Sequence, residues 1–162
     1  MSNQRQFTAA PDANTVYSDA LYPIDMEETL FGSQQVYICE GFKDFTFSVG
    51  FEDDFFVPLP LSASHAMAGA NIIVCLSAKN EQVGRNTYLQ HIIKAQSTQL
   101  TCGYVFTNAG AGESTTDYVY AGHNYIAENG DILAESKPFS TGLTISEIDV
   151  AKLAQERLSS NA

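Results

Sequence analysis

Glu52, Asp53 and Asp54 form the densest group of carboxylates in the sequence. They follow an alternating segment, residues 45–50, whose aromatic and β-branched side chains predict a strand. Sites in open α/β sheets collect beyond the carboxyl ends of strands, and neighbouring carboxylates there can bind a divalent metal ion or act as a general acid and base. A solvated loop is the alternative interpretation, because no second group of ligands with a recognisable spacing accompanies them.

Lys79 and Arg85 are the next candidates, and they flank a loop that follows the apolar segment 70–77. There they could bind the carboxylate of a substrate, or they could simply lie in solvent. The small-residue loop 109–117 (AGAGESTTD) is not a P-loop, because no Gly-Lys-Ser/Thr follows at the required spacing. Its small residues allow the close approach of a ligand or of a neighbouring strand. The sequence indicates no bound cofactor.

The cysteines and histidines indicate no further site. Cys39, Cys75 and Cys102 are odd in number and widely spaced, so neither a zinc site nor a disulfide framework is indicated. Free thiols are the default in a reducing cytoplasm, and Cys75, inside an apolar run, is expected to be buried and inert. The three histidines, at positions 65, 91 and 123, are scattered, and each is expected to be structural or at the surface.

The chain has 162 residues and 17.6 kDa, which is the size of one domain. It carries 8 basic and 19 acidic residues, so its formal charge is −11. A negative field repels phosphate backbones, so nucleic acid is not an expected partner. No window approaches the ~20 apolar residues of a membrane-spanning helix, and no signal peptide is visible. We therefore expect a cytoplasmic protein that does not enter a membrane.

The elements that must position these residues form an α/β layered pattern. Residues 1–30 are polar and predict a poorly ordered arm, and residues 159–162 a short tail. An Asn129-Gly130 pair predicts a hairpin, two prolines predict an extended loop over residues 53–60, and the run 70–77 suits a strand covered on both faces. Strands are predicted over residues 36–39, 45–50, 70–77, 103–108, 118–121, 124–127, 132–135 and 143–148, and helices over 62–69 (Ser62 as N-cap, Gly69 as stop), 86–102 and 149–158 (Asp149 as cap).

Several segments, taken in order, resemble the amidase domain (nitrilase-like, carbon–nitrogen hydrolase) of glutamine-dependent NAD synthetases. The resemblance runs from about residue 31 to residue 158, and its most specific segments are LSAKNEQVGR and GESTTD. It implies a partial αββα sandwich and, in the family, hydrolysis of glutamine to glutamate and ammonia by a Cys, a Glu and a Lys. The segments are residues 44–47 (DFTF), 52–60 (EDDFFVPLP), 64–70 (SHAMAGA), 76–85 (LSAKNEQVGR), 112–117 (GESTTD), 127–130 (AENG) and 133–136 (LAES).

This chain differs from the family pattern at the catalytic residues. The family pattern at the nucleophile is Ile-Cys-Glu-Asp, and this chain has Phe51-Glu52-Asp53-Asp54, so Glu52 occupies the nucleophile position. The family's base and its Lys belong to an N-terminal part for which we find no counterpart, which predicts a truncated domain without glutaminase activity. The resemblance places Lys79 and Arg85 in the substrate-recognition loop and Glu113 near the site. Lys79 replaces a small residue, and we expect it to fill the pocket or to pair with Glu52.

Three functions follow from these observations. The first is a truncated, inactive glutaminase-type domain, and the second is a non-catalytic binding or regulatory module that docks on an NAD synthetase. The third is a metal-dependent enzyme that uses Glu52, Asp53 and Asp54. A sandwich cut partway leaves an apolar face uncovered, so we expect a homo-oligomer, a complementing chain or an ATP-dependent NAD synthetase domain as partner. Glutamine or a related amide is the expected ligand.

Overall fold

The computed structural model describes residues 15–17, 29–113 and 117–160, and its chain divides into two units, residues 1–35 and residues 36–162. In the first unit, β1 (Thr15–Tyr17) pairs with β2 (Thr29–Phe31) in antiparallel fashion. Most of the predicted N-terminal arm, and the last two residues of the predicted tail, lie outside the described residues. The candidate site belongs to the second unit.

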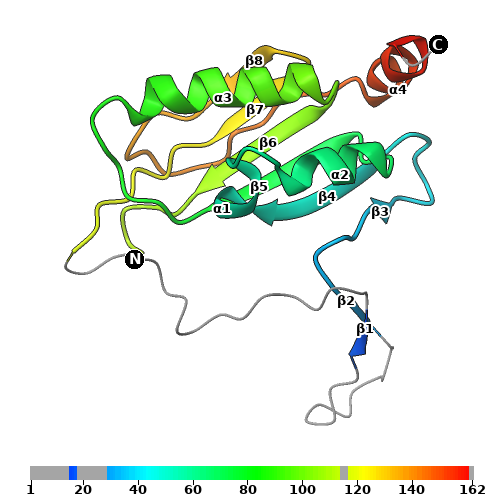
Figure 1. The fold of residues 1–162 in the computed structure, drawn as a ribbon. Helices are drawn as coiled ribbons and strands as arrows, with labels where there is room; N and C mark the ends of the chain where they lie inside the picture. The colour runs from blue at the N-terminus through cyan, green and yellow to red at the C-terminus, as the bar shows by residue number, and fades with distance from the viewer. Residues whose placement is uncertain (1–14, 18–28, 114–116, 161–162) are drawn as a thin grey trace. The chain divides into compact units, whose positions relative to one another are not determined.

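The second unit is built on a six-stranded sheet with the order β3-β4-β5-β6-β7-β8 (Figure 1). The three strands β4, β5 and β6 are parallel to one another, and the remaining neighbours are antiparallel. This arrangement confirms the predicted α/β layered fold. The strands are β3 (Tyr37–Ile38), β4 (Thr46–Phe51), β5 (Ile72–Ser77), β6 (Gly103–Asn108), β7 (Tyr125–Glu128) and β8 (Asp131–Glu135).

Helices α1 (Glu52–Phe55), α2 (Leu61–Met67) and α3 (Arg85–Gln99) lie on one face of this sheet (Figure 1). A fourth helix, α4 (Val150–Ser160), follows the last strand, and the backbone N–H of Lys152 donates to Asp149 Oδ1, which confirms the predicted cap. Within the described part of the chain, no helix is long and apolar enough to cross a membrane.

The hydrophobic core lies between the sheet and these helices. Phe55 of α1, Ile93 of α3 and Phe106 of β6 are fully buried there. On the opposite face, Val49 is 40% exposed and Phe51 62% exposed. The prediction that residues 70–77 are covered on both faces is confirmed only in part, because Ile72 is buried on the face without helices whereas Val74 and Leu76 keep part of their surface in solvent.

Local turn chemistry accounts for several boundaries. Asn129 (φ 44°) and Gly130 (φ 98°) both adopt the left-handed conformation that a tight hairpin turn requires, which confirms the predicted hairpin. Gly69 ends α2 at φ 105°, as predicted. Ser62, by contrast, does not cap that helix. It lies within the helix, and its hydroxyl donates to Gln96 Oε1 at 3.1 Å.

Three predicted elements were wrong. Residues 118–121 and 143–148 are not strands, and the backbone of the first segment bonds to a loop instead, with Glu81 N donating to Val119 O at 2.7 Å. The extended loop predicted for residues 53–60 begins later than expected, because residues 52–55 form the helical turn α1. The prolines at positions 58 and 60 restrict only their own and the preceding residues, so they leave that turn free to form.

Gly50 in β4 makes room for the chain reversal that follows it. A Cβ atom at this position would overlap the ring of Phe55, the fully buried residue that anchors α1 beneath the strand. Because Glu52 opens α1, the missing side chain at position 50 helps to fix where the Glu52 carboxylate lies.

We predict that Gly50→Ala lowers the free energy of unfolding by about 1–3 kcal/mol, because the new methyl group displaces the Phe55 ring. Denaturant unfolding measures this change. Gly41→Ala is the matched control, since a Cβ there meets nothing within 4 Å. A Gly50→Ala variant as stable as Gly41→Ala would contradict this account of α1.

Candidate functional site

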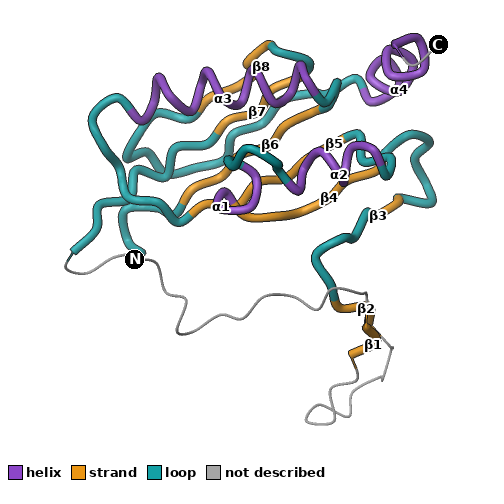
Figure 2. Tube along the Cα trace, in the orientation of Figure 1, coloured by secondary structure: helices purple, strands orange, loops and turns teal. Residues whose placement is uncertain are grey.

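The carboxyl ends of the three parallel strands meet at one edge of the sheet, where the loops that follow them gather (Figure 2). Glu52 comes directly after β4, Ser77 is the last residue of β5 and Asn108 is the last residue of β6. Register places Ser77 beside Asn108. The expectation that Glu52 follows the carboxyl end of a strand is therefore met.

Glu52 is buried at this edge, with 8% of its surface exposed. Its Oε2 atom accepts a hydrogen bond from Ser77 Oγ at 2.5 Å and forms an ion pair with Arg85 Nη2 at 2.7 Å. Arg85 opens helix α3, and its side chain is 11% exposed. The site is thus a buried carboxylate neutralised by a buried guanidinium, contributed by residues that are 33 positions apart.

Lys79 pairs with Asp53 rather than with Glu52, so the predicted Lys79–Glu52 pair was wrong. Arg85 binds the Glu52 carboxylate, and Lys79 binds the more exposed carboxylate of the neighbouring residue, Asp53. The Lys79 backbone is held by Asn108, whose Oδ1 accepts from Lys79 N at 3.2 Å and whose Nδ2 donates to Lys79 O at 3.1 Å. Lys79 therefore lies beside the site, at its solvent-facing side.

The remaining predicted site residue, Glu113, is not brought together with Glu52. Glu113 is exposed, and within the described residues no hydrogen bond or ion pair connects its side chain to Glu52, Lys79 or Arg85. Residues 114–116 of the same loop lie outside the described part. The carboxylates of Glu52 and Asp53 face different cations, and no three His, Cys, Asp or Glu side chains among the described residues converge to hold a metal ion.

A polar network that the sequence did not predict lies beneath the first turns of α3, and its two buried members are His123 and Tyr125. His123 Nε2 contacts Glu135 Oε1 at 2.8 Å, and His123 Nδ1 contacts the Tyr125 hydroxyl at 3.1 Å. That hydroxyl donates to Asn86 Oδ1 at 2.5 Å, and Asn86 is the neighbour of Arg85. Burial, followed by the nearby Glu135 carboxylate, raises the pKa of Tyr125 far above its ordinary value. The Tyr125 hydroxyl therefore keeps its proton, and its hydrogen bond to Asn86 holds the start of α3, from which Arg85 extends.

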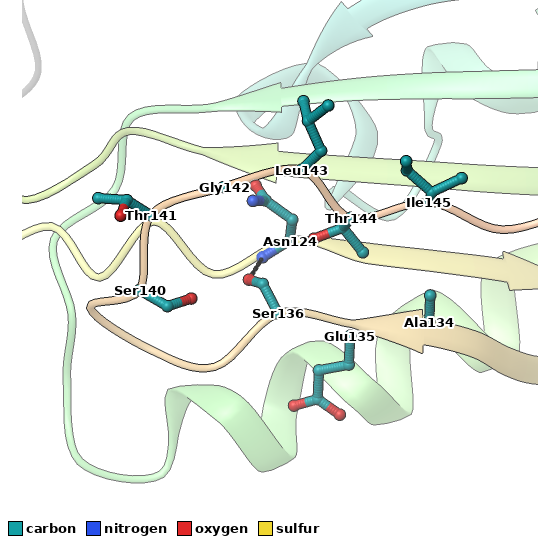
Figure 3. A pocket seen from close by; sticks show the side chains of 10 residues that line it. All are labelled: Asn124, Ala134, Glu135, Ser136, Ser140, Thr141, Gly142, Leu143, Thr144 and Ile145. Atoms are coloured by element: carbon teal, nitrogen blue, oxygen red, sulfur yellow. Dashed lines mark hydrogen bonds between the residues drawn. The ribbon is translucent and has the colours of Figure 1, made fainter.

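A separate pocket of about 290 Å³ lies between residues 140–145, Asn124 and the end of strand β8 (Figure 3). Its charged lining residue, Glu135, has its carboxylate directed toward α3, where His123 and Gln90 bind it. None of Glu52, Lys79, Arg85 and Glu113 lines this pocket. It is therefore distinct from the site at the carboxyl ends of the parallel strands.

Comparison with known proteins shows to which proteins this chain is similar in sequence. No protein-family model matches the chain. Glutamine-dependent NAD(+) synthetase from Mycobacterium tuberculosis is 35% identical over 133 residues, which are 81% of this chain and 20% of that protein. The Mycobacterium leprae enzyme of the same name is 35% identical over 130 residues, which are 79% of this chain and 19% of that protein. The chain therefore spans about a fifth of the length of these relatives.

Solved structures identify the fold. A glutamine-dependent NAD(+) synthetase from Cytophaga hutchinsonii superposes with a TM-score of 0.68 at 21% identity, covering 87% of this chain and 21% of that one. Nit3 of Saccharomyces cerevisiae, a nitrilase-superfamily member, superposes with a TM-score of 0.59 at 20% identity, covering 70% of this chain and 41% of that one. The chain is a relative of the amidase domain of glutamine-dependent NAD(+) synthetases. Its fold is that of the carbon–nitrogen hydrolases.

In this amidase-domain homologue, none of the three cysteines supplies a thiol at position 52. Cys75 and Cys102 are fully buried, and burial raises the pKa of each to about 12. Cys39 is partly exposed. All three are free thiols, as predicted. Because the thiolate is the nucleophilic form, the two buried thiols are chemically inert at neutral pH.

We predict that only Cys39 reacts with Ellman's reagent in native buffer at about pH 8, because a pKa of about 12 leaves roughly one buried thiol in ten thousand ionised. The absorbance of the released thiolate counts reactive groups, and all three should react in guanidinium. Cys39→Ser should abolish the native reaction. Rapid native reaction of all three thiols would contradict the burial of Cys75 and Cys102.

Proposed function

We propose that this chain is a glutaminase-type domain of the NAD synthetase kind that does not release ammonia from glutamine. The observation that carries the proposal is the state of Glu52. This residue occupies the position that the resemblance assigns to the nucleophile, and its carboxylate is bound by Arg85 and Ser77.

The chemistry of a carboxylate at this position supports the proposal. Covalent catalysis requires a nucleophile activated by a base or by a lowered pKa, and amide hydrolysis in this family uses a cysteine thiolate. The lone pairs of Glu52 Oε2 are already engaged by two donors. Attack by a carboxylate on an amide would expel ammonia and form an acid anhydride. The anhydride is a better acyl donor than the amide, so ammonia would reverse the step.

We expect no ammonia release above the buffer blank when the purified chain is incubated with L-glutamine, and the same result for Glu52→Cys. The thiol would lie beside Arg85, but the resemblance finds no counterpart of the family's base and Lys in these residues. An enzyme-coupled ammonia assay makes the measurement, and Glu52→Gln is the isosteric control. Ammonia release by the unmodified chain would refute the proposal, and release by Glu52→Cys would refute the account of the missing base.

A second candidate function is a docking module, and the sheet face without helices supports it. Tyr37 stacks on Phe47 at a centroid distance of 5.1 Å on this face, and both Tyr37 and Val49 are two-fifths exposed or more. Register aligns Val49 with Val74 and Val74 with Val105, so the apolar surface continues across three strands. Exposed apolar surfaces of this kind mark interaction sites. An NAD synthetase domain, a complementing chain or a second copy would cover it.

We expect the isolated chain to self-associate through this face, and we expect Val49→Lys to shift it toward the monomer, because the new charge would be buried without a partner. Sedimentation velocity measures the change. Leu59→Lys is the control, since Leu59 is 91% exposed in the loop before α2. A compact monomer whose sedimentation is unaffected by Val49→Lys would contradict the homo-oligomer.

A further inference from the structure

The hydrogen-bonding capacity of Arg85 is only partly used. Its Nη2 atom contacts Glu52 Oε2 at 2.7 Å, but its Nε atom is buried and has no hydrogen-bond partner among the described residues. A guanidinium presents these donors as a fork that matches both oxygens of one carboxylate. A buried donor without a partner costs free energy, so its presence next to an ion pair indicates a binding geometry that is incompletely filled.

The attachment of Glu52 to the backbone explains why its carboxylate contacts Arg85 Nη2 but not Nε. Its carboxylate reaches Arg85 from the first residue of α1, so the backbone limits its angle of approach. Both contacts of the carboxylate, to Arg85 Nη2 and to Ser77 Oγ, fall on the same oxygen, Oε2. A free carboxylate has no such attachment, and it could turn so that its two oxygens accept from Nε and Nη2 together.

We propose that Arg85 and Ser77 form a binding site for small carboxylates, and that the Glu52 side chain is its built-in occupant. The inference rests on the proposed function, in which Glu52 is a resident ligand and not a nucleophile. In the unmodified chain the resident carboxylate excludes a soluble one. Removal of the Glu52 side chain beyond Cβ exposes the guanidinium and the hydroxyl to small carboxylates from solution.

Acetate is the probe that matches this space, because it supplies the same heavy atoms that Glu52→Ala removes. We expect about 100 mM sodium acetate to raise the Tm of Glu52→Ala by roughly 3 °C over sodium chloride of equal ionic strength, as for a Kd on the order of 10 mM. The chloride reference removes the general screening of the acidic chain. The unmodified chain, whose site is filled, should show no difference between the two salts.

The double variant Glu52→Ala with Arg85→Ala is the matched control, because it has the same space without the guanidinium. An acetate response of Glu52→Ala that exceeds that of the double variant supports the site, and equal responses overturn it. If Glu52→Ala does not fold in chloride, refolding becomes the readout. Recovery of folded protein in acetate but not in chloride supports the site, and recovery in neither salt overturns it.

The result of the acetate experiment is independent of the result of the ammonia assay that tests the proposed function. Ammonia release by the unmodified chain would refute the absence of glutaminase activity, whatever the acetate experiment shows. Failure of acetate to stabilise Glu52→Ala would refute the carboxylate site while leaving the ammonia result unchanged. L-glutamine in place of acetate measures the size of the site: a response to both extends the ligand class to amino acids, and a response to acetate alone restricts it to small carboxylates.

Discussion

The buried ion pair between Glu52 and Arg85 is the interaction on which the carboxyl edge of the sheet depends. Each charge loses its water when it is buried, and this cost is offset only when the partner lies close and in good geometry. The pair spans 2.7 Å and connects the turn after β4 to the start of α3. Displacement of either element would leave the other charge buried and unpaired, so the ion pair fixes their relative position.

Two independent sets of contacts hold Glu52 and Arg85 in place. On the Glu52 side, Gly50 lets the Phe55 ring lie against the strand, so that α1 turns immediately at residue 52. On the Arg85 side, the hydrogen bond from Tyr125 to Asn86 anchors the residue next to the guanidinium. Both sets of contacts use core residues that face the helices. The geometry of the ion pair is therefore determined by packing in the core as well as by the attraction between the charges.

This dependence explains how much of the molecule the sequence predicted. The strands of the central sheet and the Asn129-Gly130 hairpin follow from local periodicity and turn chemistry, and the structure confirms them. The position of Glu52 directly after a strand was predicted from the same pattern. Residues 118–121 and 143–148 carry strand-like patterns, but a ladder needs a neighbour, and these segments lack one within the described part of the chain.

Which cation pairs with which carboxylate in the site could not be predicted from local sequence patterns. Lys79 is nearer to Glu52 in sequence than Arg85 is, yet Arg85 takes the carboxylate because α3 begins beside it. The network of His123, Tyr125 and Asn86 escaped prediction for the same reason, since its members come together only when α3 packs on β7. The one local signal was the spacing of His123 and Tyr125, two residues apart in an extended segment, which places both side chains on the same face.

The distribution of positive charge determines what the site can offer a ligand. Of 8 basic residues in a chain of charge −11, Arg85 and Lys79 are each paired with a carboxylate at the same edge of the sheet. Arg157 is used differently, because its guanidinium donates to backbone carbonyls that include those of Leu100 and Ala70. The cations at the carboxyl edge are therefore neutralised internally. An anionic ligand approaching that edge meets no net attraction unless it replaces a resident carboxylate, so the identity of residue 52 decides whether the guanidinium of Arg85 is available to a ligand.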